Sequence, residues 1–205
     1  MKERPIIFSA PMVRAILEGR KTQTRRIVKD NPVDIVTLIG ADDKPTGEYG
    51  LCFHPSVIER RVSCPYGQPG DRLWVRERGW MAPSKTAFTP YVGNERSSPP
   101  LNPDNLPYKA CPSIHMPRWA SRIDLEITGI RVERLCNITP EDCWAEGLEA
   151  WLENDDNLPK YEDGSPGKYM NEKTAFRALW QSINGPGSWI ENPWVWAVKF
   201  KRISP

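Results

Sequence analysis

The sequence lacks several features that would assign a functional class directly. No apolar run is long enough to span a membrane, and the amino-terminal residues do not resemble a signal peptide. The two histidines and five cysteines include no Cys-x-x-Cys pair, so a metal site is not expected. A formal net charge of +2 is too small to indicate nucleic-acid binding by the whole surface. We therefore expect a cytoplasmic protein with reduced thiols, no cofactor, no membrane partner and at most a local basic site.

Tryptophan and proline, in contrast, are abundant. Nine tryptophans predict an aromatic core, a stacking surface, or both. The 21 prolines predict long ordered loops instead of long helices. Eight of them fall within residues 79–122, where hydrophobic periodicity is weak. We interpret that segment as a long irregular insertion that leaves the core and returns to it.

The remaining pattern predicts short strands and a few short helices. Strands are expected at residues 4–8, 22–28, 72–77, 123–135 and 193–202, and helices after Ser9, Thr139 and Asn171. The alternation in the longest strand slips at Thr128-Gly129, which is typical of a bulge in a strand that wraps around a barrel. The sequence therefore predicts one α+β domain over residues 1–205: a small, mostly antiparallel β-barrel with flanking short helices and the insertion at about 79–122.

The stretch from Gly19 to Arg26 concentrates chemically active groups. It contains one glycine, one lysine, two threonines and three arginines. The glycine can end the preceding helix in a left-handed conformation, and the arginines can hold an anionic backbone. Lys21 and Thr24 can serve as a general base or a nucleophile when activated. On these residues alone, a solvated basic edge of a hairpin is an equal alternative.

The same stretch resembles the G-x-K-x-x-T-x-R signature of ASCH domains, which belong to the PUA-like superfamily. Pro69–Val75 resembles the "PGD" turn and strand that follow in this family, and Ala145–Gly147 resembles its acidic helix end. Residues 115–123 and 192–200 are similar to blocks of longer members that phages and prophages often encode. The resemblance implies a PUA-like barrel with a cleft for RNA or a modified nucleoside.

The resemblance also implies a catalytic triad. Small bacterial members hydrolyse the amide of N4-acetylcytidine with a lysine, a threonine and a glutamate, which correspond here to Lys21, Thr24 and Glu146. In the implied scheme Lys21 takes a proton, Thr24 attacks the acetyl carbonyl, and Glu146 protonates the leaving amine. A helix end disfavours a carboxylate, which suits a proton donor at position 146.

Two demands follow for the other members of this triad. Lys21 needs burial or neighbouring arginines to lose its proton. Because positions 21 and 24 face opposite sides of a straight strand, Lys21 must also lie before the strand, or the chain must turn at Thr22-Gln23.

Basic and aromatic residues are the candidates for binding the substrate or nucleic acid. They are Arg20, Arg25, Arg26, Arg72, Trp74, Arg76, Arg118 and Trp119. The alternatives are ordinary surface charge for the arginines and packing against the insertion for the tryptophans. Two other functions stay open: a non-catalytic module that binds single-stranded RNA or DNA, and a phage accessory protein that binds another protein.

Overall fold

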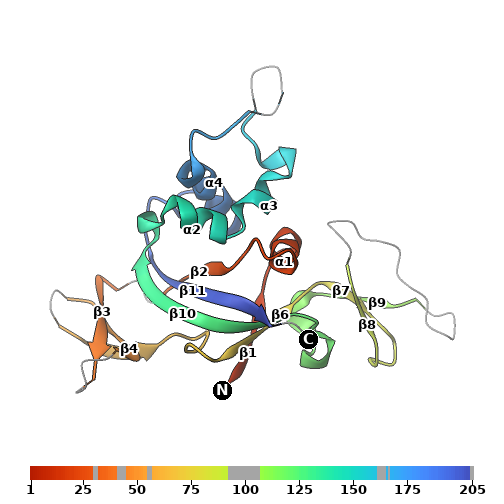
Figure 1. Cartoon of the computed structure of the whole chain (residues 1–205), viewed down its shortest axis with the longest axis horizontal. Coiled ribbons are helices and arrows are strands. Elements are labelled where there is room, and N and C mark those ends of the chain that lie inside the picture. Colours follow the sequence, from red (N-terminus) through yellow and green to blue (C-terminus); the bar gives the residue numbers. More distant parts are fainter. Residues whose placement is uncertain are drawn as a thin grey trace.

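A computed structural model describes residues 1–29, 32–40, 45–54, 57–91, 107–160, 165 and 167–203. Its central sheet has the strand order β1-β6-β10-β11-β2 (Figure 1). The strands are β1 (Glu3–Ile7), β2 (Gln23–Ile27), β6 (Arg72–Arg76), β10 (Asp124–Arg134) and β11 (Trp194–Ile203). Only the β1–β6 pair of this sheet is parallel; the other pairs are antiparallel.

Two three-stranded sheets flank the central one on opposite sides (Figure 1). The first consists of β3 (Asp34–Ile39), β4 (Pro45–Cys52) and β5 (Arg60–Ser63). The second consists of β7 (Gly79–Met81), β8 (Phe88–Pro90) and β9 (Lys109–Cys111). The first sheet packs on the central one through Tyr49, whose ring meets that of Trp196 edge-on at a centroid distance of 4.9 Å.

The second small sheet lies within the predicted irregular insertion. Its strands have three residues each, and two short 3-10 helices follow, Ser113–His115 and Arg118–Ala120. Strands of this length are too short for hydrophobic alternation to reveal, so proline content alone suggested an irregular segment. Residues 92–106 of the insertion lie outside the described part of the chain.

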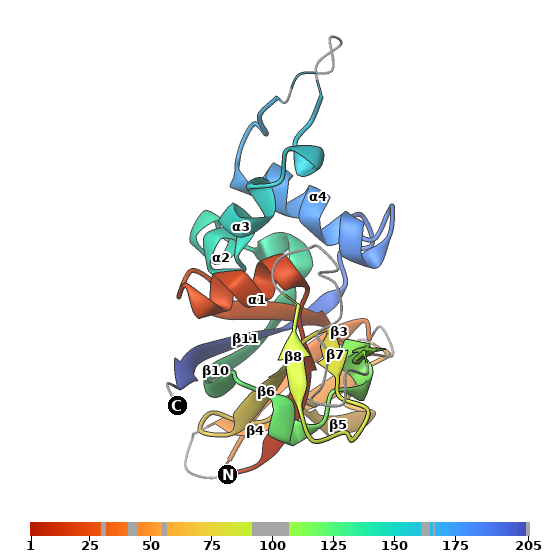
Figure 2. The same cartoon turned by 90° about the vertical axis from the view of Figure 1, so that its right-hand side faces the viewer.

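Four α-helices form a layer on one side of the central sheet (Figures 1 and 2). They are α1 (Ala10–Leu17), α2 (Pro140–Ala145), α3 (Leu148–Leu152) and α4 (Glu172–Asn184). Helix α2 begins at Thr139, whose hydroxyl accepts a hydrogen bond from the amide of Asp142 at 3.2 Å. Helix α4 begins at Asn171, whose side chain accepts from the amide of Thr174 at 2.9 Å. These two capping predictions are confirmed, whereas the predicted cap at Ser9 is wrong, because its side chain makes no capping hydrogen bond.

The mixed α and β architecture and the mainly antiparallel pairing agree with the sequence prediction. The register of β10 against β11 shifts between Ile127 and Gly129, which confirms the predicted bulge. The central sheet is open, however: β1 and β2 are its two edges, and the described strands do not close into a barrel. Helices and the β3–β5 sheet bury its faces instead. No described helix has the length and apolar character needed to cross a membrane.

The two serine or threonine N-caps predict different effects on stability. We expect Thr139→Ala to lower the free energy of unfolding by about 1 kcal/mol, because the α2 amide of Asp142 loses its acceptor. Ser9→Ala is the matched control: Ser9 precedes α1, but its side chain makes no capping hydrogen bond. Urea unfolding of both variants measures the difference. Equal losses in the two variants would contradict this account of the caps.

Candidate functional site

Lys21 lies in the short connection between α1 and β2. Gly19 takes a φ of +77° after the end of α1, and the amide of Lys21 then donates to the carbonyl of Ala15 at 3.0 Å. The amide of Thr22 donates to the carbonyl of Ala145, the last residue of α2, at 2.9 Å. The connection is therefore fixed between two helices. Lys21 precedes the first residue of β2, which satisfies one of the demands that the triad makes.

The side chain of Lys21 is buried against the end of α2. Its Nζ lies 3.1 Å from Oε2 of Glu146, and it also donates to the carbonyl oxygen of Gln23 at 2.7 Å. Burial is the main cause that lowers the pKa of Lys21, and the nearby charges of Arg26 and Arg25 act in the same direction. Glu146 opposes the shift. The environment thus supplies the burial that a lysine base requires.

Glu146 is placed by the end of α2. It is the residue that caps the helix C-terminus, and Gly147 follows with a φ of +83°. Only 5% of Glu146 is exposed. One carboxylate oxygen pairs with Lys21, and the other accepts from Nη1 of Arg25 at 3.1 Å. Glu146 is therefore held between two cations, 125 and 121 positions away in the sequence.

Arg25 is the centre of a larger group of charges. Its guanidinium, which is fully buried, also donates to Glu133 at 3.0 Å and to Asp142 at 2.7 Å. Arg131 binds the same two carboxylates from β10. The strand registers pair both Arg25 and Arg131 with Ala197, whose small side chain leaves room above β11 for the two arginines.

We call this group the buried charge network. Its members are Lys21, Arg25, Arg131, Glu133, Asp142 and Glu146. Three cations face three anions, so the network is formally neutral. Burial of these charges is tolerated because each has a partner of opposite sign.

Thr24, the third predicted catalytic residue, is buried on β2 but points elsewhere. Successive side chains of a strand face opposite sides of the sheet, so Thr24 and Arg25 diverge. Arg25 reaches Glu146, and within the described chain no hydrogen bond joins the Thr24 hydroxyl to Lys21 or Glu146. The structure therefore brings together two of the three predicted catalytic residues.

The predicted binding residues near this site are engaged in other contacts. Arg25 cannot bind a nucleic-acid phosphate, because its side chain is buried among three carboxylates. This corrects the prediction, which treated Arg25 as part of a basic surface. Arg20 is paired with Glu18, which follows α1, and with Glu153, which follows α3, the latter at 2.9 Å. Arg26 donates to the carbonyl of Ile7 at 2.8 Å and lies over the ring of Phe8.

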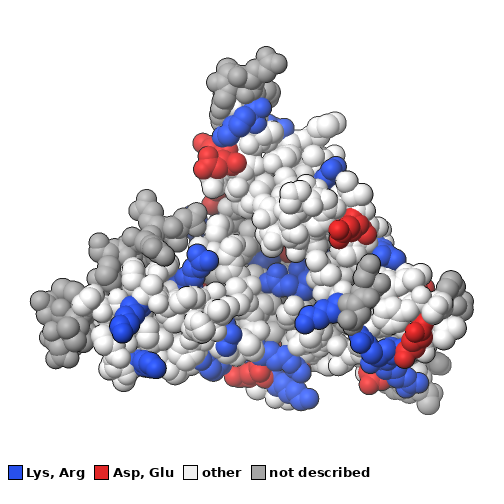
Figure 3. All heavy atoms as spheres, turned by 180° about the vertical axis from the view of Figure 1, so that it is seen from behind, with Lys and Arg blue, Asp and Glu red and all other residues white. Residues whose placement is uncertain are grey.

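The other predicted binding residues form a separate group near β6. The guanidinium carbons of Arg76 and Arg118 lie 4.8 and 5.8 Å from the ring centroid of Trp74. Arg72 lies 4.0 Å from Glu3, and Trp119 is 55% exposed. Strands β10 and β11 separate β6 from β2 in the central sheet, so these residues do not surround Lys21. Figure 3 shows basic side chains at the centre of one face, below the helical part.

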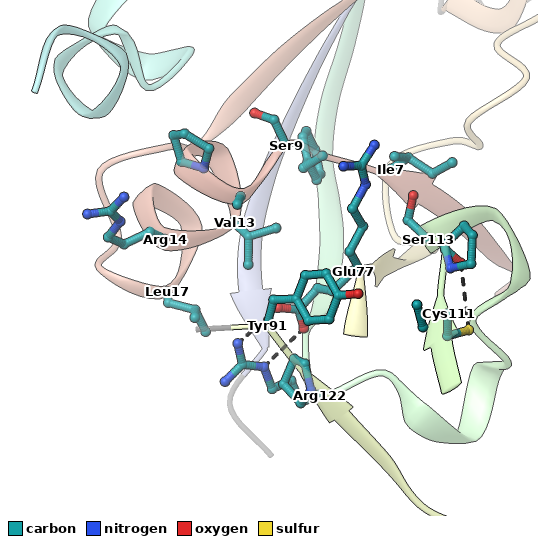
Figure 4. A pocket seen from close by; sticks show the side chains of 17 residues that line it. Ile7, Ser9, Val13, Arg14, Leu17, Glu77, Tyr91, Cys111, Ser113 and Arg122 are labelled. Atoms are coloured by element: carbon teal, nitrogen blue, oxygen red, sulfur yellow. Dashed lines mark hydrogen bonds and ion pairs between the residues drawn. The ribbon is translucent and has the colours of Figure 1, made fainter. Parts of the chain in front are cut away.

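The structure also contains a pocket that sequence reasoning missed. It has a volume of about 1020 Å³ and lies between α1 and the insertion (Figure 4). Its walls come from residues between positions 7 and 17 and from shorter runs between positions 77 and 122, which only the folded chain brings together. Phe8 links it to the predicted site, since this residue lines the pocket and its ring centroid lies 5.5 Å from Nζ of Lys21. Among the described residues, no cluster of histidine, cysteine, aspartate or glutamate suits a metal ion.

Comparisons with known proteins assign no family to this chain. No family model matches the sequence, and no curated protein matches it. One similar solved structure is an ASCH domain from Lactobacillus crispatus JV V101, with 12% identity over 98% of this chain and 79% of that chain, at a TM-score of 0.39. Another is protein EF3133 from Enterococcus faecalis V583, family-model DUF984, with 9% identity over 99% and 80% of the respective chains, at a TM-score of 0.37.

The buried charge network predicts a large stability difference between its two arginines. Arg25→Met leaves carboxylates buried without their partner, and we expect it to lower the free energy of unfolding by about 3–5 kcal/mol. Arg131→Met removes a side chain that is 34% exposed, so water can replace it and the loss should be smaller. Urea unfolding at neutral pH measures both. A loss for Arg25→Met no greater than that for Arg131→Met would contradict the assignment of Arg25 as the centre.

A glycine pair tests how tightly Lys21 is held. A Cβ at Gly147 would lie 3.2 Å from Sδ of Met12 and 3.3 Å from Cβ and Cδ of Lys21, whereas a Cβ at Gly19 meets nothing within 4 Å. Both glycines have positive φ and follow the glutamate that caps a helix, so the backbone cost of alanine is similar. We expect Gly147→Ala to lose about 1–3 kcal/mol more than Gly19→Ala, because the site is overpacked. Urea unfolding measures the free energy of unfolding of both variants. Equal losses would mean that the residues around Gly147, Lys21 among them, move aside freely.

Proposed function

We propose that this protein binds a modified nucleoside and hydrolyses an amide on its base, with N4-acetylcytidine as the model substrate. The proposal includes an ASCH-type, PUA-like relationship. The observation that supports it best is the contact between Lys21 and Glu146 at 3.1 Å, because the family resemblance requires this pair to converge from positions 125 residues apart. Burial of both residues is a second support, since a water-excluded site strengthens the interactions that act on a reacting carbonyl.

The pair can supply both proton transfers of an amide hydrolysis. A proton moved from Nζ of Lys21 to Oε2 of Glu146 converts the ion pair into a neutral amine and a carboxylic acid, with no change in net charge. The amine then accepts the proton of the attacking hydroxyl as its oxygen adds to the acetyl carbonyl. The acid protonates the exocyclic nitrogen as the C–N bond breaks, which releases cytidine.

Thr24 remains the predicted nucleophile in this proposal. Attack by its hydroxyl leaves an acetyl ester, which water hydrolyses to acetate in a second step. Because β2 directs Thr24 away from Arg25, attack requires the start of β2 to turn. Loss of turnover in Thr24→Ala, with retention in Thr24→Ser, would assign the nucleophile; full turnover by Thr24→Ala would assign attack to water.

The first test is a chromatographic assay of cytidine release from N4-acetylcytidine and other acylated nucleosides. We expect Lys21→Met and Glu146→Gln to lower kcat/KM by about 10²–10⁴-fold, because each removes one proton transfer. Lys201→Met is the matched control: Lys201 forms a lysine–glutamate pair with Glu126 at 3.2 Å, but on the surface. No turnover by folded wild-type protein, or unchanged turnover by Lys21→Met, would refute the proposal.

The pH dependence of the reaction has a defined sign. A base must be unprotonated, so kcat/KM should rise with pH through the pKa of Lys21. Since burial lowers that pKa from its ordinary value of 10.5, the rise should level off below pH 10.5. A profile with no ascending limb below pH 10.5 would contradict the role of Lys21 as base.

A second function is favoured by the surface near β6. Trp119 is exposed there, and Arg76 lies against Trp74, whose own ring is buried. An exposed aromatic ring on the same surface as a cation suits single-stranded nucleic acid. A binder of this kind should lose affinity steeply with salt and with Trp119→Ala, while Lys21→Met has no effect. The third alternative, that this protein is a phage accessory protein that binds another protein, stays a prediction.

A further inference from the structure

The pocket between α1 and the insertion has the size of a small-molecule site. Its volume of about 1020 Å³ lies at the upper end of the roughly 300–1,000 Å³ that is usual for ligand pockets. The end of β1 and helix α1 form one wall, and the strands of the insertion form the other. Figure 4 shows Tyr91 of the insertion in the middle of the pocket, between Val13 of α1 and Cys111 at the end of β9.

The charges around the pocket leave an excess of positive charge. Glu77 is buried and accepts two hydrogen bonds from Arg122, at 3.0 and 2.9 Å, so its charge is neutralised. Arg78 also lines the pocket, is exposed, and forms no ion pair with any residue in the described ranges. Arg14 has a distant partner, Glu153 at 3.8 Å, and the side chains of both are nearly half exposed. Two arginines are therefore available to an anionic ligand.

The start of α1 adds to this positive potential. Ser9, its N-cap, lines the pocket, and its side chain does not cap the helix. The first turn of α1 contains no acidic residue. The positive end of the helix dipole therefore faces the pocket without a local anion to balance it.

Two aromatic rings lie on different walls of the same pocket. Phe8 directly follows β1, and Tyr91 directly follows β8 in the insertion. The ring of Tyr91 packs on Trp80 at a centroid distance of 5.2 Å, and its amide donates to the carbonyl of Arg78 at 3.0 Å. Tyr91 and Arg78 are thus held next to each other, an aromatic surface beside a cation that has no ion-pair partner in the described part of the chain.

We propose that this pocket binds a nucleoside monophosphate, with the phosphate at Arg78 and the base against the aromatic walls. An aromatic ring provides a stacking surface for a base, and a guanidinium provides charge-assisted hydrogen bonds for a phosphate. The inference rests on the proposed function and names its substrate class: a phosphorylated nucleoside. Phe8 borders both the pocket and Lys21, so a ligand bound here lies next to the proposed catalytic pair.

Calorimetric titration tests the inference with cytidine 5′-monophosphate, cytidine and inorganic phosphate as probes. We expect the monophosphate to bind wild-type protein about 10- to 100-fold more tightly than cytidine, the gain usual for hydrogen bonds to a charged group. Arg78→Gln should remove this preference and leave cytidine binding unchanged. Arg177→Gln is the matched control, since Arg177 is exposed on α4 and contacts Gln181 outside the pocket. It should keep the full preference.

Tyr91→Ala tests the aromatic wall independently. The substitution should lower the binding affinity for cytidine and for its monophosphate by the same factor, because it removes stacking and leaves Arg78 in place. Equal affinity of wild-type protein for the two ligands, or a preference that survives in Arg78→Gln, would overturn the inference.

The binding and hydrolysis results separate this inference from the proposed function. A phosphate preference without any deacylation would support the pocket and refute the hydrolase. Deacylation of N4-acetylcytidine without a phosphate preference would support the hydrolase and overturn the nucleotide pocket.

Discussion

The buried guanidinium of Arg25 is the interaction on which the site depends. It reaches Glu133 on β10, and Asp142 and Glu146 on α2, so one side chain from β2 ties the helical layer to the sheet. A buried charge requires partners of opposite sign, and these partners fix the direction of α2. That direction in turn brings the end of α2, and with it Glu146, to Lys21. The proposed catalytic pair is thus a consequence of a structural ion cluster.

The sequence predicts those features of the fold that depend on residues close together in the chain. The caps Thr139 and Asn171 and the bulge before Gly129 follow from side-chain chemistry and strand alternation within a few residues. The convergence of Lys21 and Glu146 is different. No local rule joins positions 125 residues apart; the family resemblance suggested this contact.

The features that the sequence did not predict depend on distant partners. Arg25 stands in a basic stretch, and nothing near it in the chain indicates that its charge is neutralised by acids more than 100 positions away. The prediction of a closed barrel was wrong, because the alternation of hydrophobic and polar residues describes single strands and does not show which strand edges pair. The pocket beside Tyr91 is equally non-local, since the insertion must fold back on α1 to form it.

The most direct test of the account is an NMR titration of the Lys21 side chain, followed through its Cε resonance in selectively labelled protein. The account predicts that the pKa of Lys21 lies below the ordinary value of 10.5, because the amine is buried. In Glu146→Gln the pKa should fall further, since the carboxylate that favours the charged form is gone. A Lys21 pKa at or above 10.5, unchanged in Glu146→Gln, would contradict both the buried pair and the chemistry proposed for it.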